Sequence, residues 1–342
     1  MENRTIVKCI YGAGKYGKKL LDYFRSTGSE IDFFVQTDQP AERIVSGLMV
    51  KSIQEIEDEN KNYIFYIALA DKEVVEEIKG AISKLSLKNV KVYECGKFIE
   101  ENLPYTGTAP EGTKECIICG NTKVQFYPAG IKEEFFNKYH IIGGGYRQDA
   151  ICPCCDSIDR ERWLFYVLTN ILKITENAGR ILHFAPEKNI SLILSKNTMI
   201  DYYTGDIKSG AAMHVTDITD IQYKDGIFDY VISSHVMEHI IDEEKAVSEI
   251  MRVLKPTGKW IFSFPICMEF KTYEDASIVT EEQRLKAYGQ KDHVRLYGND
   301  FKERFEKYGL KLQIYRPKDE LSMELIKKWG LIEDDIIICA GK

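Results

Sequence analysis

Along residues 5–95, continuous apolar runs alternate with segments in which apolar residues recur every three or four positions. Short apolar runs, which are typical of buried strands, fall at residues 5–14, 31–38, 62–70 and 90–95. Between them, residues 15–28 and 72–85 repeat apolar side chains every three or four positions, which is the period of an amphipathic helix. Strands that alternate with helices pair in parallel, because each helix carries the chain back across the sheet. We therefore predict an α/β, Rossmann-like domain over residues 1–105.

The second half of the chain repeats this alternation over a longer stretch. Residues 102–113, which are rich in proline and glycine, interrupt both periods and are expected to link the two regions. An amphipathic helix is predicted at residues 158–172. Seven strand candidates follow, at residues 180–185, 199–205, 213–218, 228–234, 259–265, 310–315 and 334–340. Helical segments separate most of them, so the pattern predicts a seven-stranded sheet with helices on both faces over residues 161–342.

Composition and charge narrow the class of protein. The 342 residues are 44% apolar and 29% charged, which suffices to bury more than one core. A formal net charge of −7 argues against a broad nucleic-acid surface, because phosphate binding needs clustered Lys and Arg. The sequence has no apolar run of the roughly 18 residues that a membrane span needs, and its first residues lack a signal-peptide core. We therefore expect a cytoplasmic protein.

Two Cys-x-x-Cys pairs lie in residues 113–160, at Cys116 with Cys119 and at Cys152 with Cys155. In a reducing compartment, clustered thiols bind metal more often than they form disulfides. Two such pairs surround one tetrahedral ion, and structural Zn²⁺ prefers four sulfur ligands. We predict a small zinc-binding module here. Cys154 offers an alternative second pair with Cys152, and four core or redox cysteines are the other alternative. The glycine-rich segment 141–147 between the pairs is expected to turn the chain or contact a ligand.

A glycine-rich turn follows the first strand, in the order Gly12-Ala-Gly14-Lys-Tyr-Gly17. Such a turn lets the backbone approach a phosphate at a helix N-terminus, so these glycines are candidate nucleotide-binding residues. The alternative is that they only permit close packing of the strand against the helix. Residues 1–105 resemble the small Rossmann-like domains attached to bacterial sugar-tailoring enzymes, among them sugar-nucleotide acetyltransferases and sugar C-methyltransferases. In the acetyltransferases, the resemblance implies a nucleotide-sugar ligand.

The sharpest motif is FDYVISSHVMEH at residues 228–239, which a helix and then RVLKPTG at residues 252–258 follow. Asp242 is predicted to cap this helix, and Pro256 with Gly258 to end it. These segments resemble the fourth strand, fourth helix and fifth strand of class I S-adenosylmethionine (SAM) dependent methyltransferases.

Further motifs extend this resemblance over about residues 116–342. HFAPE at residues 183–187, TYED at residues 272–275 and DHVR at residues 292–295 resemble a bacterial branch of the class with an N-terminal zinc knuckle. The resemblance implies the fold, the cofactor SAM and a structural zinc ion.

The resemblance also implies a SAM site at successive strand ends. Carried over by position, its residues are His183, Ala185 and Glu187 for the methionine part, Asp206 for the ribose, Asp217 and Ile218 for the adenine, and Ser234 beside the methyl donor. The sequence departs from the class at the first turn, where HFAPEKN replaces a glycine-rich D-x-G-x-G. The backbone must therefore approach the methionine carboxylate differently. For His183 and Glu187, a turn held by Pro186 is the alternative interpretation.

Catalysis needs few groups, because the sulfonium of SAM already supplies a good leaving group. The protein must align the acceptor and, for a hydroxyl or amine, accept a proton. Candidates are His235 and the run Asp292-His293-Val-Arg295. We expect His293 to act as the base, with a structural or substrate-orienting role as the alternative, and Arg295 to pair with a carboxylate or phosphate. His235 and His239 could share a metal ion, although the sequence indicates no third ligand.

The sequence is consistent with three functions. The first is methylation of a small acceptor, with a sugar or nucleotide-sugar of bacterial glycan biosynthesis favoured by the N-terminal domain. The second is methylation of another metabolite, or of a protein or nucleic acid through the zinc module. The third is a non-catalytic scaffold with a degraded methyltransferase fold. The altered first turn favours the scaffold, whereas Asp206, Asp217 and the DHVR motif at residues 292–295 oppose it.

Overall fold

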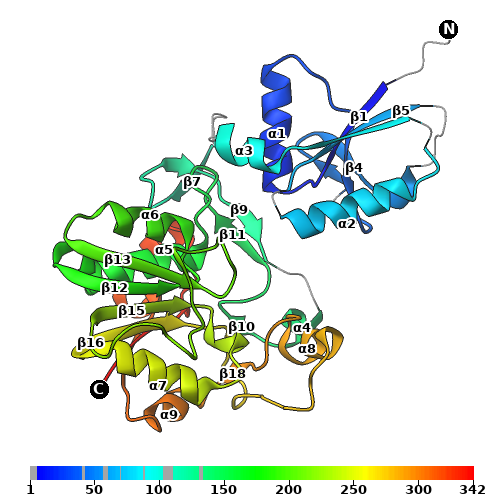
Figure 1. Cartoon of the computed structure of the whole chain (residues 1–342). Coiled ribbons are helices and arrows are strands. Elements are labelled where there is room, and N and C mark those ends of the chain that lie inside the picture. Colours follow the sequence, from blue (N-terminus) through cyan, green and yellow to red (C-terminus); the bar gives the residue numbers. More distant parts are fainter. Residues whose placement is uncertain are drawn as a thin grey trace. The chain divides into compact units, whose positions relative to one another are not determined.

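The computed structural model of the chain describes residues 6–40, 43–56, 61–69, 71–87, 89–102, 111–130 and 134–342. The chain forms two compact units, Met1–Ala109 and Pro110–Lys342 (Figure 1). Most of the predicted linker, including Pro104 and Gly107, lies outside the described residues. The second unit includes the predicted zinc-binding segment together with the large C-terminal sheet. A separate zinc module stays a prediction.

The first unit is a six-stranded sheet with helices on both faces. Its strands are β1 (Ile6–Tyr11), β2 (Phe33–Gln36), β3 (Ile44–Val45), β4 (Leu48–Ser52), β5 (Asn62–Ile67) and β6 (Asn89–Glu94), in the order β3-β4-β2-β1-β5-β6. Only the pairing of β3 with β4 is antiparallel. Helix α2 (Lys72–Ser83) packs on one face, while α1 (Lys15–Ser26) and α3 (Gly96–Asn102) pack on the other. The predicted strand and helix positions are found, but the β3–β4 hairpin is an addition.

The second unit contains a seven-stranded, mainly parallel sheet. Its strands are β12 (Gly179–Phe184), β13 (Ile200–Asp206), β14 (His214–Val215), β15 (Phe228–Ser234), β16 (Leu254–Ser263), β19 (Lys311–Tyr315) and β20 (Ile337–Gly341), in the order β14-β13-β12-β15-β16-β20-β19. Only β20 runs antiparallel to its neighbours. The order reverses between β12 and β15, which makes this point the topological switch of the sheet.

Helices cover both faces of this sheet, as the alternation predicts. Helices α7 (Glu243–Val253) and α9 (Phe301–Glu306) pack on one face, where they lie close together in Figure 1. The other face carries α5 (Asp159–Tyr166), α6 (Lys188–Lys196) and α11 (Met323–Lys328). The helix predicted over residues 158–172 ends as α5 at Tyr166 and continues as a π-helical turn, Val167–Ile171.

The end of α7 differs from the prediction. Asp242 caps the helix as expected, because its side chain accepts a hydrogen bond from Lys245 N. However, the helix already ends at Val253, and Leu254 adopts extended backbone angles. Gly226 N donates to the carbonyl of Arg252, and Ile227 N donates to that of Val253. These two carbonyls at the end of the helix therefore have hydrogen-bond partners without a capping residue. Residues 256 and 258 therefore lie inside β16 instead of ending the helix.

Small sheets join the Cys-rich segment to the large sheet's loops. Strand β7 (Glu111–Glu115) pairs with β8 (Thr122–Val124), and β9 (Tyr127–Ala129) pairs with β11 (Arg147–Ile151). Strand β10 (Ile141–Ile142) joins β17 (Ile266–Cys267), which pairs in turn with β18 (Tyr297–Gly298). Two shorter helices, α4 (Glu134–Lys138) and α8 (Glu281–Tyr288), lie in these same segments, and α10 (Pro317–Glu320) precedes α11.

Candidate functional site

The carboxyl ends of adjacent parallel strands meet at one edge of the large sheet. The register pairs Phe184 with residues of both β13 and β15. Ala185, Asp206 and Ser234 therefore lie along the same edge, at the switch point between β12 and β15. Open α/β sheets bind their ligands at this position, because the loops there diverge and leave a crevice. The structure thus brings most of the predicted SAM residues to one edge.

Two residues at this edge have left-handed backbone angles although they are not glycines. Ala185, directly after β12, has φ +45°, and His235, directly after β15, has φ +55°. Each is held by a backbone bond to the neighbouring strand, from Ala185 N to Gly205 O (2.9 Å) and from His235 N to Ser263 O (2.9 Å). Such angles are uncommon for residues with a side chain and concentrate at functional sites. Here they turn the chain sharply away from both strand ends.

His183, which is buried, and Glu187, which is half-buried, form a pair behind the first turn. Nε2 of His183 lies 2.9 Å from Oε2 of Glu187, and Nδ1 lies 2.8 Å from the hydroxyl of Tyr202. Burial raises the pKa of the Glu187 carboxyl, but the contacts with His183 and with Ser234 lower it below its ordinary value. Glu187 is thus an anion at neutral pH. Nδ1 of His183 is held by Tyr202, and Nε2 faces the Glu187 carboxylate at ion-pair distance, so the ring orients Glu187.

Glu161 is a second buried acid at this edge, and the sequence analysis missed it. It lies on α5, and its carboxylate accepts hydrogen bonds from Asn189 N (3.1 Å) and Asn189 Nδ2 (3.3 Å) in the first turn of α6. Burial and the nearby charge of Glu187 raise its pKa. The only signal in the sequence is a charged residue on the apolar side of a predicted helix, which does not by itself name a partner.

Asp206 and Asp217 end β13 and follow β14. Asp206 Oδ1 accepts from Lys208 N (2.7 Å), and Asp217 Oδ1 accepts from Thr219 N and Thr219 Oγ1 (both 2.8 Å). Each bond uses one carboxylate oxygen and fixes the direction of the side chain. Ile218 is buried in the core beneath.

The predicted catalytic segments come together beyond β15. Val294 N donates to the carbonyl of Glu238 (2.9 Å), which joins residues 292–295 to the 3₁₀ turn Met237–His239. The centroids of the His239 and His293 rings lie 4.8 Å apart, and the two rings are nearly perpendicular. Nδ1 of His239 lies 3.3 Å from both the carbonyl oxygen and Oδ2 of Asp292. Asp292, His293 and the 237–239 turn thus form one cluster.

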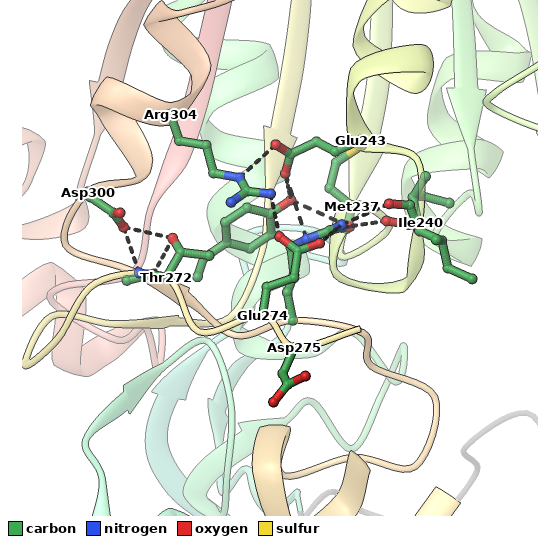
Figure 2. A network of polar contacts seen from close by, with 12 residues as sticks. Met237, Ile240, Glu243, Thr272, Glu274, Asp275, Asp300 and Arg304 are labelled. Carbon is green, nitrogen blue, oxygen red and sulfur yellow. Dashed lines mark hydrogen bonds and ion pairs between the residues drawn. The ribbon is translucent and has the colours of Figure 1, made fainter. Parts of the chain in front are cut away.

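Arg295 lies in a different environment from the one predicted. Its side chain is fully buried, and Nη1 donates to the carbonyls of Met237 (2.7 Å) and Ile240 (2.5 Å). Nη2 donates to Glu274 (2.6 Å), and Arg304 bridges Glu274 and Glu243 (Figure 2). The carboxylate that Arg295 pairs with therefore belongs to the protein. The residue clamps the turn that carries His239.

His235 lies among buried charged groups. Its Nδ1 is 3.2 Å from Oε1 of Glu238 and 3.4 Å from Nη1 of Arg160. Burial and the Arg160 charge hold the pKa of His235 well below its ordinary value, so the ring is neutral at pH 7. Burial raises the pKa of Glu238 to about 8 and that of Asp335 to about 7. Sequence reasoning missed Arg160 and Asp335, because no local pattern relates them to His235.

The glycine-rich segment 141–147 links this group to a cavity. A Cβ at Gly143 would lie 3.3 Å from the His235 ring and 3.5 Å from Asp335 Oδ1, so only glycine fits there without a shift. The following residues line a cavity of about 430 Å³. Its walls are formed by Phe136, Tyr139, His140, Ile141, Ile142, Gly144, Gly145, Tyr146, Arg147 and Ile332. The segment expected to turn the chain or contact a ligand thus lines a cavity beside His235.

The four predicted cysteine ligands converge in two matching turns. Cys116 N donates to the carbonyl of the residue five positions later, Asn121, and Cys152 N donates in the same way to the carbonyl of Ser157. Gly120 and Asp156, at the same place in each turn, both have positive φ. The sulfurs of Cys116 and Cys155 lie 3.6 Å apart, and those of Cys119 and Cys152 lie 3.8 Å apart. Four sulfurs about 2.3 Å from one zinc ion are separated by about 3.8 Å. The donor set therefore fits Zn²⁺.

Cys154 lies outside this cluster of four sulfurs. Its backbone N–H instead donates to Sγ of Cys152 (3.4 Å), and Asn121 Nδ2 donates to Sγ of Cys119 (3.4 Å). Such bonds stabilise thiolates around a metal ion. The geometry favours Cys155 over the alternative pair with Cys154.

The glycines of the first unit have a packing role. A Cβ at Gly17 would lie 1.8 Å from the carbonyl oxygen of Gly12, which itself has φ +102°. Gly14 has open space around it and precedes α1. The close approach of helix to turn therefore accounts for Gly12 and Gly17, and nucleotide binding by these residues stays a prediction. Within the described ranges, no helix is long and apolar enough to span a bilayer.

Comparison with known proteins agrees with the strand order of the second unit. Residues 190–262, from α6 to β16, match the family model described as "Methyltransferase domain". Ajmaline N-methyltransferase from Rauvolfia serpentina is 31% identical over 83 residues, which cover 24% of this chain and 28% of that enzyme. Phosphoethanolamine N-methyltransferase 2 from Caenorhabditis elegans is 47% identical over 45 residues, or 13% of this chain and 10% of that enzyme. The chain thus aligns with less than a third of either relative.

Solved structures with a similar arrangement include the PH0226 protein from Pyrococcus horikoshii OT3, at 16% identity and a TM-score of 0.35 over 53% of this chain and 91% of that one. Phosphoethanolamine N-methyltransferase 2 from Haemonchus contortus, solved with SAM, is 12% identical with a TM-score of 0.34, over 100% of this chain and 95% of that one. The family match and the strand order indicate a class I, SAM-dependent methyltransferase domain in the second unit.

Proposed function

We propose that the protein transfers the methyl group of SAM to an oxygen or nitrogen atom of a small acceptor. The observation that carries this proposal is the position of His235. It follows β15 at the carboxyl edge of the sheet and abuts Gly143 beside a cavity of about 430 Å³. A neutral imidazole thus lies at the edge expected to hold SAM, next to the segment that lines a cavity of small-molecule size.

SAM carries positive charge on its sulfonium and its ammonium group, and the strand-end residues suit it. The anionic Glu187 and its neighbour Glu161 provide negative charge near the first turn. The left-handed Ala185 exposes the backbone there and replaces the glycine-rich turn of the class. In this proposal, Asp206 accepts hydrogen bonds from the ribose hydroxyls. Asp217 and Ile218 contact the adenine, and Ser234 lies beside the methyl donor. His183 acts through Glu187, which it orients.

His235 accepts the acceptor's proton in this mechanism. Its Nδ1 is directed by Glu238 and Arg160, while Nε2 is buried and has no hydrogen-bond partner among the described residues. The acceptor atom attacks the methyl carbon, the carbon–sulfur bond breaks, and S-adenosylhomocysteine leaves. The sequence favours His293 as the base. The structure favours His235, because His235 abuts the segment that lines the cavity.

The acceptor class rests on the cavity and on two resemblances. Aromatic and apolar side chains line the cavity together with the imidazole of His140 and the cation of Arg147, which suits a compact organic molecule. The two curated relatives are named for N-methylation of ajmaline and of phosphoethanolamine. A sugar or nucleotide-sugar follows from the resemblance of residues 1–105 alone. Mass spectrometry of molecules retained through purification identifies the acceptor class directly.

Cys116, Cys119, Cys152 and Cys155 hold a structural zinc ion in this proposal. The ion ties β7 and β11 to the start of α5, which carries Glu161. Arg162, the next residue of the same helix, is fully buried and donates to the carbonyls of Ser157 and Gly330. The zinc ion thus supports the site's position and takes no part in methyl transfer.

Calorimetry with SAM and S-adenosylhomocysteine tests the proposal. The wild-type chain should bind both, and Asp206→Asn should bind them at least tenfold more weakly, since a charge-assisted hydrogen bond contributes about 1.5–3 kcal/mol. Asp201→Asn is the matched control, because Asp201 lies on the same strand at its opposite end and is 65% exposed. Absence of binding by either ligand at submillimolar concentration would contradict the proposal and favour the non-catalytic scaffold.

A further inference from the structure

We infer that Glu238, His239 and His293 bind a divalent metal ion beside the acceptor site; only the catalytic role of that ion rests on the proposed function. One ligand atom from each residue lies within 4.8 Å of the others. Ligands about 2.0–2.2 Å from a common ion are at most about 4.4 Å apart, so small side-chain rotations close the cluster. The cluster is separate from the four cysteines.

Two buried atoms of this cluster lack partners. Glu238 is 1% exposed and His293 is 3% exposed. Among the described residues, Glu238 Oε2 and His293 Nδ1 have no hydrogen-bond partner. Leaving such polar atoms unpaired in the interior is costly, and native structures rarely do so. A cation between them would satisfy both atoms at once.

The surroundings already orient the three ligands. His239 Nδ1 lies 3.3 Å from Asp292 Oδ2 and from the Asp292 carbonyl oxygen, which directs its proton there and leaves Nε2 for a metal ion. Metal-binding histidines commonly have such a carboxylate or carbonyl partner. Oε1 of Glu238 contacts His235 Nδ1 at 3.2 Å, so Oε2 is the oxygen that remains. The residues around the cluster therefore resemble the second shell of a metal site.

Two imidazoles and one carboxylate define the class of ion. This donor set is typical of catalytic Zn²⁺ and of Fe²⁺, and it leaves coordination positions for water or substrate. His239 is 33% exposed, so the cluster has a route to solvent. The ligands contain nitrogen and oxygen but no sulfur, which also distinguishes this site chemically from the cysteine site.

A metal ion here selects hydroxyl acceptors over amines. It would bind the acceptor oxygen and lower the pKa of its hydroxyl group. The hydroxyl proton would pass to His235 Nε2, and the acceptor oxygen would attack the methyl carbon of SAM. The carbon–sulfur bond breaks and its electron pair stays on sulfur, which gives a methyl ether and S-adenosylhomocysteine. An amine bound to the ion would instead have its lone pair occupied.

Cobalt(II) titration of the purified full chain tests the site without an acceptor. Cobalt in a four-thiolate site shows intense sulfur-to-metal charge-transfer absorption, whereas cobalt bound by Glu238, His239 and His293 shows only weak visible bands. With the cysteine site filled, the wild-type chain should bind one further equivalent of the second kind. Glu238→Gln, His239→Ala and His293→Ala should each weaken that equivalent at least tenfold. Glu282→Gln and His214→Ala, which change exposed residues outside the cluster, should leave it within twofold.

Two results would overturn the inference. One is the absence of a second equivalent at millimolar cobalt, and the other is wild-type affinity in the three cluster variants. If the buried substitutions prevent folding, the partly exposed His239→Ala decides alone. SAM calorimetry on the same samples separates the two proposals. A wild-type chain that binds SAM but no second metal ion contradicts the metal site, while a wild-type chain that binds the second metal ion but no SAM contradicts the proposed function.

Discussion

Nε2 of His183, inside β12, lies 2.9 Å from Oε2 of Glu187, which directly precedes α6. This contact spans the turn in which the chain departs from the glycine-rich pattern of its class. Because Tyr202 holds the other ring nitrogen, the imidazole is fixed in direction. A side-chain pair therefore holds the turn where backbone flexibility is otherwise expected. The first prediction follows from this pair.

Glu187→Gln should weaken SAM binding by about tenfold or more, because the amide keeps the shape of the side chain but removes its charge. His183→Gln should weaken it less, since Glu187 stays charged but loses its orientation. Calorimetry with SAM measures both. Glu176→Gln, on an exposed 3₁₀ turn of the same domain, is the control and should bind as the wild type does. Equal affinity in all three variants would remove Glu187 from the SAM site.

Cys155→Ser should lose the bound zinc, whereas Cys154→Ser should keep it. The four sulfurs that converge exclude Cys154, and a structural zinc ion is bound with full affinity only by its complete ligand set. Elemental analysis of freshly purified protein gives the metal content, and thermal unfolding gives the accompanying loss of stability. Zinc retained by Cys155→Ser and lost by Cys154→Ser would instead establish the alternative pair.

Stability should fall as the pH rises from about 4 to 7, in part because of Asp335. Burial and the nearby Asp159 raise the pKa of Asp335 to about 7 in the folded chain. The unfolded chain releases this proton near pH 3.9, so between these values the folded state binds more protons and loses stability as pH rises. Three pKa units correspond to about 4 kcal/mol as an upper estimate.

Asp335→Asn should flatten this pH dependence, because an amide does not titrate. Its oxygen can still accept the bond that Ile336 N donates to Asp335 Oδ1 (3.0 Å). Urea unfolding at pH 4.5, 6 and 7.5 compares the variant with the wild type, and contributions of other groups cancel in the difference. The same slope in both proteins would show that Asp335 titrates normally.

Arg295→Met should destabilise the chain by about 3–5 kcal/mol, since it leaves Glu274 with one cation fewer and the carbonyls of the 237–241 turn without donors. Urea unfolding measures the change. Lys286→Met removes a cation from an exposed ion pair with Glu282 and should stay close to the wild type. A stability loss below about 1 kcal/mol for Arg295→Met would show that the clamp in Figure 2 contributes little.

Local patterns gave most elements of both sheets, except the β3–β4 hairpin, and named candidate site residues. Apolar periodicity depends only on neighbouring positions, so it located the strands that carry Asp206 and Ser234. The spacing within each Cys-x-x-Cys pair depends on a single turn of backbone, and the four sulfurs do converge. The motifs around His235 and His293 named the residues that now lie in one region.

Tertiary structure alone decided how those residues are used. Glu161 approaches Asn189 because α5 and α6 pack on the same face of the sheet, and no periodicity records that contact. The sequence predicts that Arg295 binds a carboxylate or phosphate of the substrate. In the structure, its hydrogen-bond partners are turn carbonyls and Glu274. Gly143 lies against the His235 ring because β10, which precedes it, pairs with β17. Such contacts depend on the order of strands and on burial, which no segment determines by itself, whereas each segment does determine its own helix or strand.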